Sequence, residues 1–304
     1  MPLWIAASIF AAFMQNLRFA LQRHLKVTTL STGGATWARF AFAVPFVALL
    51  LLAYKGISGQ DMPAIGPGYW GYVVTGAMAQ MTATACVVAL FARRNFYVGI
   101  TLKKSEVLLT AFVGLVVLGE AVSAPVMVAI GVGFAGVLAL SDPPQETGLP
   151  WSARIFNSAS GYGLASGLLF GVSAVCYRGA ILALDGGDAP LRAAMALLTA
   201  TIVQTATLGV WLAIRERGQI TAVVASWRIT SLTGLTSMLG SIGWFIAFAL
   251  QTAAYVKALG QIELLFTFLY SAFWLREKTT RNEVIGIALI VVSLALILWA
   301  GLRG

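Results

Sequence analysis

Two glutamates and two lysines lie deep within long apolar segments, where ionisable side chains are rare. Glu106 follows Lys103 and Lys104 in one such segment, and Glu263 lies in another, close to Gln261. An ionised group inside a bilayer costs about 3 kcal/mol or more, which makes these side chains functional candidates. Lys103 could attract the carboxylate of a solute, and a glutamate could bind an amine or take up a coupling proton. The simpler alternative is that the lysines snorkel to the membrane interface while the glutamates hold structural hydrogen bonds.

Spacing ties these residues to one another. Lys103 and Glu106 are three positions apart, so they can pair on one face of a helix. The two glutamates are separated by an offset of 263 − 106 = 157 residues. The same offset relates Leu118-Gly119-Glu120 to Leu275-Arg276-Glu277, since 277 − 120 = 157. The shared order of these matches predicts an internal repeat, with the two glutamates at similar depth.

Further candidate residues come from other apolar segments. Arg18 and Arg178 lie late in two segments at matching places, and Asn16 neighbours the first. A guanidinium there could hold an anionic group with two hydrogen bonds, or else anchor the chain at the interface or hold the repeats together by an ion pair. Trp244 and Tyr270 lie well inside their segments and are candidates for the wall of a solute cavity, although most membrane aromatics face lipid or the interface.

The sequence contains no pattern typical of an enzyme, so we expect no catalytic residue, metal or cofactor. The single histidine, His24, lies in a basic stretch and cannot by itself form a histidine metal site. Cys86 and Cys176 lie in apolar segments without the spacing of a metal site or a disulfide framework. No Walker-type phosphate loop is present, which argues against ATP as the energy source. The net charge is +9, but the sequence contains no patch in which basic and aromatic residues alternate, so no nucleic-acid partner is expected.

The elements that must position these residues are membrane helices. Of the 304 residues, 59% are hydrophobic and only 10% are charged, and the apolar stretches reach the ~20 residues needed to span a bilayer. The sequence predicts an all-α integral membrane protein with ten transmembrane helices. We expect them over residues 3–22, 33–54, 69–91, 97–118, 124–140, 160–184, 190–214, 229–250, 254–275 and 283–302.

The longest polar connection, residues 141–157, divides these helices five and five. It would separate a first five-helix repeat, residues 1–140, from a second, residues 158–304. Because five is odd, the second repeat must enter the membrane from the opposite side, which makes the repeats inverted. Inverted repeats with a solute site near the membrane midplane are a recurring transporter architecture.

With these features the chain resembles the EamA type of the drug/metabolite transporter superfamily. The residues that carry the resemblance are Leu118-Gly119-Glu120 with Ile130-Gly131, Glu277 with Ile285-Gly286, and Arg39 opening the second segment. The resemblance implies ten helices in two inverted five-helix repeats, a central cavity, and export or exchange of amino acids or other small metabolites. Members often carry a proline near the middle of the fourth and ninth helices, where this chain instead has Glu106 and Glu263.

We therefore expect a secondary carrier that works by alternating access on a small amine- or carboxylate-bearing metabolite, by efflux or exchange. The alternatives are a membrane-embedded enzyme, a lipid flippase, or a receptor or assembly factor that transports nothing. Expected partners are the solute, a coupling proton and membrane lipid, with the chain a monomer or a homodimer. A bacterial inner membrane is the expected location.

The orientation of the chain is predicted differently by two arguments. On the side opposite the N-terminus, the loops and their flanks carry eleven cations, against four on the N-terminal side, which are Lys55, Arg192, Lys257 and Arg303. Cytoplasmic loops hold the excess of Lys and Arg, so this count favours both termini outside. The resemblance instead implies both termini inside. The eleven are Arg23, Lys26, Arg93, Arg94, Arg154, Arg215, Arg217, Arg228, Arg276, Lys278 and Arg281.

Overall fold

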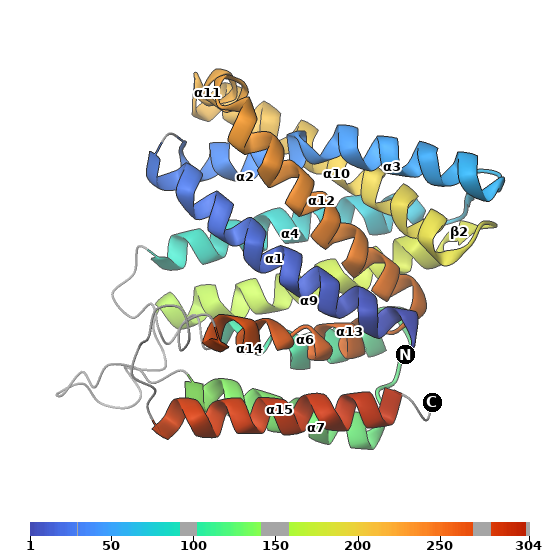
Figure 1. Ribbon diagram of the computed structural model, residues 1–304, viewed down its shortest axis with the longest axis vertical. Helices are drawn as coiled ribbons and strands as arrows, with labels where there is room; N and C mark the ends of the chain where they lie inside the picture. The colour runs from blue at the N-terminus through green and yellow to red at the C-terminus, as the bar shows by residue number, and fades with distance from the viewer. Residues whose placement is uncertain (29, 92–101, 141–157, 270–280, 302–304) are drawn as a thin grey trace. The chain divides into compact units, whose positions relative to one another are not determined.

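The structure is a computed structural model that describes residues 1–28, 30–91, 102–140, 158–269 and 281–301 (Figure 1). It divides into two compact units. Unit 1 comprises Met1–Met78 and Cys176–Gln251, and unit 2 comprises Ala79–Val175 and Thr252–Gly304. Each unit therefore combines segments from both halves of the chain. The predicted division at residues 141–157 concerns sequence repeats, which these units do not test, and it stays a prediction.

Each of the ten predicted spans contains helix among the residues that the structure describes, although described residues 42, 104–105, 183–184 and 260–261 are not helical. Five helical segments of the described chain are long and apolar enough to cross a membrane: Thr32–Ser58, Ser160–Leu182, Ala189–Arg215, Trp227–Leu250 and Arg281–Gly301. The helices are α1 (Leu3–Thr28), α2 (Thr32–Ala41), α3 (Ala43–Ser58), α4 (Tyr69–Phe91), α6 (Glu106–Leu118), α7 (Ala124–Leu140), α9 (Ser158–Leu182), α10 (Ala189–Arg215), α11 (Gln219–Ala225), α12 (Trp227–Leu250), α13 (Ala253–Leu259), α14 (Ile262–Leu269) and α15 (Arg281–Gly301).

Three of the predicted spans are interrupted, where the sequence was expected to form continuous helices. The second span breaks at Phe42, between α2 and α3. Pro45 follows within α3, and it has no N–H to donate to the carbonyl of Ala41, which removes the hydrogen bond that would bridge the break. The fourth span has a turn at residues 104–105, just before α6, and the ninth has a turn at residues 260–261, between α13 and α14.

In unit 1, α1 packs against α12, and α2, α3, α10 and α12 pack against one another. A Cβ added at Gly243 would lie 2.9 Å from the Ala7 carbonyl, and one at Gly240 would lie 3.5 Å from Met14, so α1 and α12 run antiparallel in close contact. Small residues allow this approach of two backbones. Two short strands, β1 (Ala64–Ile65) and β2 (Leu184–Asp185), also pair antiparallel here, a minor addition to the predicted all-α fold.

A polar contact between the C-terminal part of α3 and the N-terminal end of α10 ties the two halves of the chain together within unit 1. Asp188 is the N-cap of α10 and accepts a 2.9 Å hydrogen bond from the Leu191 N–H. The other carboxylate oxygen accepts hydrogen bonds from the Tyr54 hydroxyl at 2.6 Å and from Gln60 Nε2 at 2.9 Å. Burial acts to raise the pKa of Asp188, but these hydrogen bonds outweigh it and hold the pKa below its ordinary value.

In unit 2, α7 and α15 lie side by side (Figure 1). A Cβ on Gly133 would lie 2.6 Å from Ser293 Oγ, and one on Gly136 would lie 2.8 Å from the Gly286 carbonyl. Residues further along α7 contact residues earlier in α15, so the two helices are antiparallel. Ser293 Oγ donates a 2.6 Å hydrogen bond across this contact to the Ala129 carbonyl. Glycine at these positions is required because any side chain would separate the helices.

Candidate solute-binding site

Both partly buried glutamates lie in the first turn of a helix that begins directly after a break. Glu106 is the first residue of α6, with Ser105 at the N-cap, and Glu263 is the second residue of α14. An acidic side chain is favourable at this end of a helix because the first N–H groups give it a partial positive charge. The two breaks therefore occur at the positions that the sequence repeat predicts to be equivalent.

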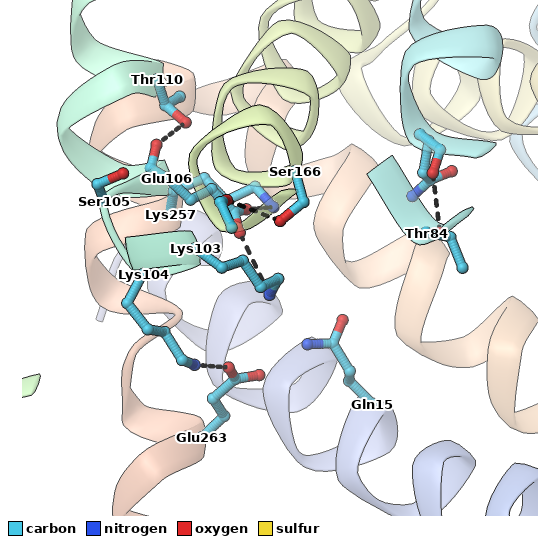
Figure 2. Close-up of polar contacts among 12 residues, drawn as sticks. Gln15, Thr84, Lys103, Lys104, Ser105, Glu106, Thr110, Ser166, Lys257 and Glu263 are labelled. Atoms are coloured by element: carbon cyan, nitrogen blue, oxygen red, sulfur yellow. Dashed lines mark hydrogen bonds and ion pairs between the residues drawn. The ribbon is translucent and has the colours of Figure 1, made fainter. Parts of the chain in front are cut away.

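The glutamates form ion pairs with lysines from the other half of the chain (Figure 2). Lys257 Nζ lies 2.6 Å from Glu106 Oε1, and Lys104 Nζ lies 3.1 Å from Glu263 Oε1. Lys103 Nζ lies 3.7 Å from Glu106 Oε2, which confirms the predicted pairing of residues three apart. We call Lys103, Lys104, Glu106, Lys257 and Glu263 the charged cluster, and all five belong to unit 2.

The charged cluster is partly buried and has an excess of positive charge. Its side chains are between 14% and 24% exposed, with Glu106 the least exposed and Lys257 the most. Three lysines face two glutamates, which leaves a formal charge of +1. Glu106 contacts two of the lysines, and the Lys103 contact is the longest in the cluster. Of the three lysines in the cluster, Lys103 is therefore the one with the longest contact to a carboxylate.

Helix α9 backs the cluster with small residues. A Cβ on Gly167 would lie 2.9 Å from the Lys103 carbonyl, and one on Gly171 would lie 3.1 Å from Thr110. Helix α9 therefore approaches its neighbours closely at these two glycines, whereas Gly161 has no other atom within 4 Å of its Cβ position. Between them, the Phe170 ring lies 4.9 Å from Lys103 Nζ. An aromatic face at this distance stabilises a partly desolvated ammonium.

Lys257 is the residue that sequence reasoning missed. Its position near the start of a predicted span assigned it to the cations outside the membrane. In the structure it lies in α13, flanked by the buried residues Val256 and Ala258, and α13 packs against α6. A lysine inside an apolar stretch shortly before Glu263 was the available signal.

Of the other predicted site residues, Arg18, Asn16, Arg178 and Trp244 belong to unit 1. Arg18 is buried, and Asn16 is half-buried beside it in α1. Arg178 donates hydrogen bonds to the carbonyls of Phe248 at 2.6 Å and Gln251 at 2.8 Å, at the C-terminal end of α12. A cation there satisfies carbonyls that have no partner within the helix. This contact favours the structural alternative for Arg178.

The two predicted aromatic wall residues have different outcomes. Trp244 lies in α12 and donates a 3.3 Å hydrogen bond from Nε1 to Gln15 Oε1 of α1, within unit 1. Its ring stacks near that of Phe248, with centroids 6.5 Å apart. Tyr270 lies outside the described residues. Among the residues that the structure does describe, no group of three or more His, Cys, Asp or Glu could hold a metal ion, and both cysteines are free.

Comparison with known proteins gives a family match for the second half of the chain and solved structures with a similar fold. The sequence model of the EamA-like transporter family matches residues 157–299. No curated protein matches the chain. Among solved structures, 27 chains match. One, described only as a crystal structure of a protein, has a TM-score of 0.67 at 14% identity, and the match covers 99% of this chain and 98% of that one. At this identity the likeness shows a shared fold.

Proposed function

We propose that this chain, whose residues 157–299 match the EamA-like transporter family, is a secondary carrier for a small metabolite bearing an amine or a carboxylate. The family match indicates a multi-pass membrane transporter of the drug/metabolite type. The proposal adds the chemistry of the solute, its movement by alternating access in efflux or exchange, and a bacterial inner membrane as the location. It also assigns the solute contacts to the charged cluster.

One observation carries this proposal: at each of two broken helices, a glutamate from one half of the chain forms an ion pair with a lysine from the other half. Glu106 pairs with Lys257 at 2.6 Å, and Glu263 pairs with Lys104 at 3.1 Å. Ion pairs that serve structure alone add little stability in apolar surroundings, because the free-energy cost of desolvation offsets most of their attraction. Broken helices in corresponding positions of two halves are typical of transporter binding sites. Their coincidence supports a site at which solute charges replace protein charges.

A solute with both charges could enter by exchanging partners. Its ammonium would replace a lysine at Glu106 or Glu263, and its carboxylate would bind Lys103, whose own contact to Glu106 is only 3.7 Å. Each replacement removes one of the links between α6 and α13–α14, so solute binding would loosen a contact that holds these elements together. Protonation of a glutamate would have the same effect, which is how a coupling proton could act.

Alternating access is supported by the way the helices pair. If residues 1–140 and 158–304 are inverted repeats, the α1–α12 contact is equivalent to a contact between α9 and α4. A Cβ on Gly179 of α9 would lie 2.8 Å from the Tyr72 ring of α4, so this contact is present. The remaining pairs, α6 with α13 and α7 with α15, are equivalent to themselves. Matched contacts of this kind allow two conformations of similar energy, which alternating access requires.

The test is counterflow into vesicles that contain the purified protein. Vesicles are loaded with unlabelled amino acids, amines or organic acids, and uptake of the same labelled compound is followed. A carrier gives transient, saturable accumulation of an unchanged compound. Chemical conversion of the compound would establish an enzyme instead. Movement of labelled lipid between leaflets without any solute counterflow would establish a flippase.

A further inference from the structure

A buried arginine in unit 1 has no anionic partner among the residues that the structure describes. Arg39 lies near the end of α2, within the apolar segment Thr32–Ser58, and only 8% of it is exposed. Its Nε is a buried donor without a hydrogen-bond partner among the described residues. No carboxylate in the described part of the chain forms an ion pair with it; Asp188 and Glu216, for example, bind Tyr54 and Ser31 instead.

The contact that Arg39 does make leaves this donor unused. Its guanidinium carbon lies 4.4 Å from the centre of the Phe40 ring. An aromatic ring stabilises a guanidinium through the flat face of the cation. The N–H donors of a guanidinium lie in its plane, so a face contact does not satisfy them. A buried charged group with an unused donor is unfavourable unless a hydrogen-bond acceptor binds it, and an anion supplies both the acceptor and the opposite charge.

Two polar side chains of unit 1 lie at the level of Arg39. Trp37 Nε1 donates a 2.9 Å hydrogen bond to the Thr205 carbonyl, and Gly33 contacts Leu212, so α2 and α10 run antiparallel with Arg39 level with Gln204. Gln204 is 3% exposed and donates a 3.0 Å hydrogen bond from Nε2 to the Tyr177 hydroxyl. Tyr177 is buried as well, with 3% of it exposed.

We propose that Arg39, with Tyr177 and Gln204 beside it, forms a binding site for the carboxylate of a small soluble anion. The guanidinium supplies charge and an in-plane N–H, and the Tyr177–Gln204 pair supplies neutral polar groups that can orient the carboxylate. The apolar wall includes the Phe245 ring, whose centre is 4.8 Å from that of Tyr177. Low polarity strengthens the charge-assisted hydrogen bond. This site belongs to unit 1 and does not rest on the solute site proposed in unit 2.

The test measures the Arg39 N–H directly. Protein with ¹⁵N-labelled arginine is prepared in maltoside micelles, which contain no phosphate or carboxylate. The Arg39 Nε–H resonance is assigned as the one absent from Arg39→Lys. Sodium acetate is then titrated against sodium chloride at equal ionic strength, and a parallel sample is placed in phosphatidylglycerol nanodiscs without acetate. We expect acetate alone to move the Arg39 resonance in a saturable manner, and chloride and lipid to leave it in place.

Variants separate binding from general salt effects. Acetate that binds at Arg39 should protect the protein against thermal unfolding, and this protection gives an apparent Kd for acetate. Arg39→Lys keeps the charge but loses the planar donors, so we expect this apparent Kd to rise about 10-fold. Tyr177→Phe should raise it less. Arg192→Lys is the matched control, because Arg192 Nε is also a buried donor without a partner among the described residues, at the start of α10. An unmoved Arg39 resonance, a shift with lipid alone, or equal loss of protection in Arg192→Lys would overturn the proposal.

Discussion

Glu106 contacts two lysines, one closely and one at a longer distance, and the sequence predicted only the longer contact. The Lys103 contact follows from helical spacing, because residues three apart share a face. The 2.6 Å contact with Lys257 joins residues 151 positions apart, and it depends on how α13 packs against α6. Local periodicity carries no information about such a pair. The sequence therefore predicted which carboxylates are unusual, and the structure was needed to identify their partners.

The stronger contact should dominate the stability of the site. Replacing Lys257 by Met leaves Glu106 with only the 3.7 Å contact to Lys103, and we expect a loss of about 1–3 kcal/mol in the free energy of unfolding, because a partly buried carboxylate loses its main partner. Lys103→Met, the matched change on the weaker contact, should cost less than about 1 kcal/mol. Unfolding by SDS in mixed micelles measures both. Equal losses for the two variants would contradict the geometry.

Asp188 should give the protein an acid-sensitive link between its halves. Hydrogen bonds lower its pKa in the folded state, so its carboxylate adds stability above the unfolded pKa and loses that contribution as the pH falls through the lower, folded pKa.

Asp188→Asn keeps the acceptor for the Leu191 N–H but loses the charge. It should cost no more than about 1 kcal/mol at pH 7, because the side chain is partly exposed. Thermal unfolding from pH 7 to pH 3 should show this difference disappearing below about pH 4. A constant difference would exclude the link.

At the level of helices, the sequence predicted where helix occurs better than where it is interrupted. The apolar segments before Glu106 and Glu263 contain no proline, and a break was not expected there. Gly260 lies in the turn after α13, but a single glycine is tolerated inside many helices and is a weak signal by itself. The breaks reflect tertiary packing, which apolar periodicity does not reveal.

The contact between α7 and α15 should depend on individual glycines. Gly136→Ala places a Cβ 2.8 Å from the Gly286 carbonyl, which is backbone and cannot move aside, so we expect a loss of about 1–3 kcal/mol in stability. Gly131→Ala is the matched control on the same helix, where the new Cβ meets no atom within 4 Å. That change should be neutral or stabilise by up to about 1 kcal/mol, as alanine favours helix. Similar losses for both would mean that the two helices are not in close contact here.

For the whole molecule, the sequence predicted an internal repeat, which stays a prediction, and it did not predict the compact units. Matches at a constant offset compare residues in order, so they detect repeats. Unit 1 and unit 2 each take elements from both halves, an arrangement that depends on contacts between distant segments. The family match over residues 157–299 agrees with the resemblance that both halves suggested, and it covers most of the predicted second repeat, residues 158–304.

The orientation in the membrane is a property of the whole chain that a fusion experiment can measure. Eleven loop cations against four predict that both termini lie outside the cytoplasm, since cationic loops are retained inside. We therefore expect a reporter that is active only in the cytoplasm to be inactive when fused after Gly304. The same reporter placed in the connection at residues 141–157 should be active. The reverse pattern would show that the family orientation holds and that the charge count is misleading.

The central claim, that the charged cluster handles the solute, is tested most directly by counterflow with conservative variants. Glu106→Gln and Glu263→Gln keep the size of each side chain and remove its charge. Glu283→Gln, a matched change in the first turn of α15, lies outside the cluster. We predict that each cluster variant folds at normal yield and loses about 10-fold or more of the initial rate, equivalent to about 1.4 kcal/mol, while Glu283→Gln keeps the wild-type rate. Wild-type counterflow by both cluster variants would contradict the account and leave these ion pairs with a structural role.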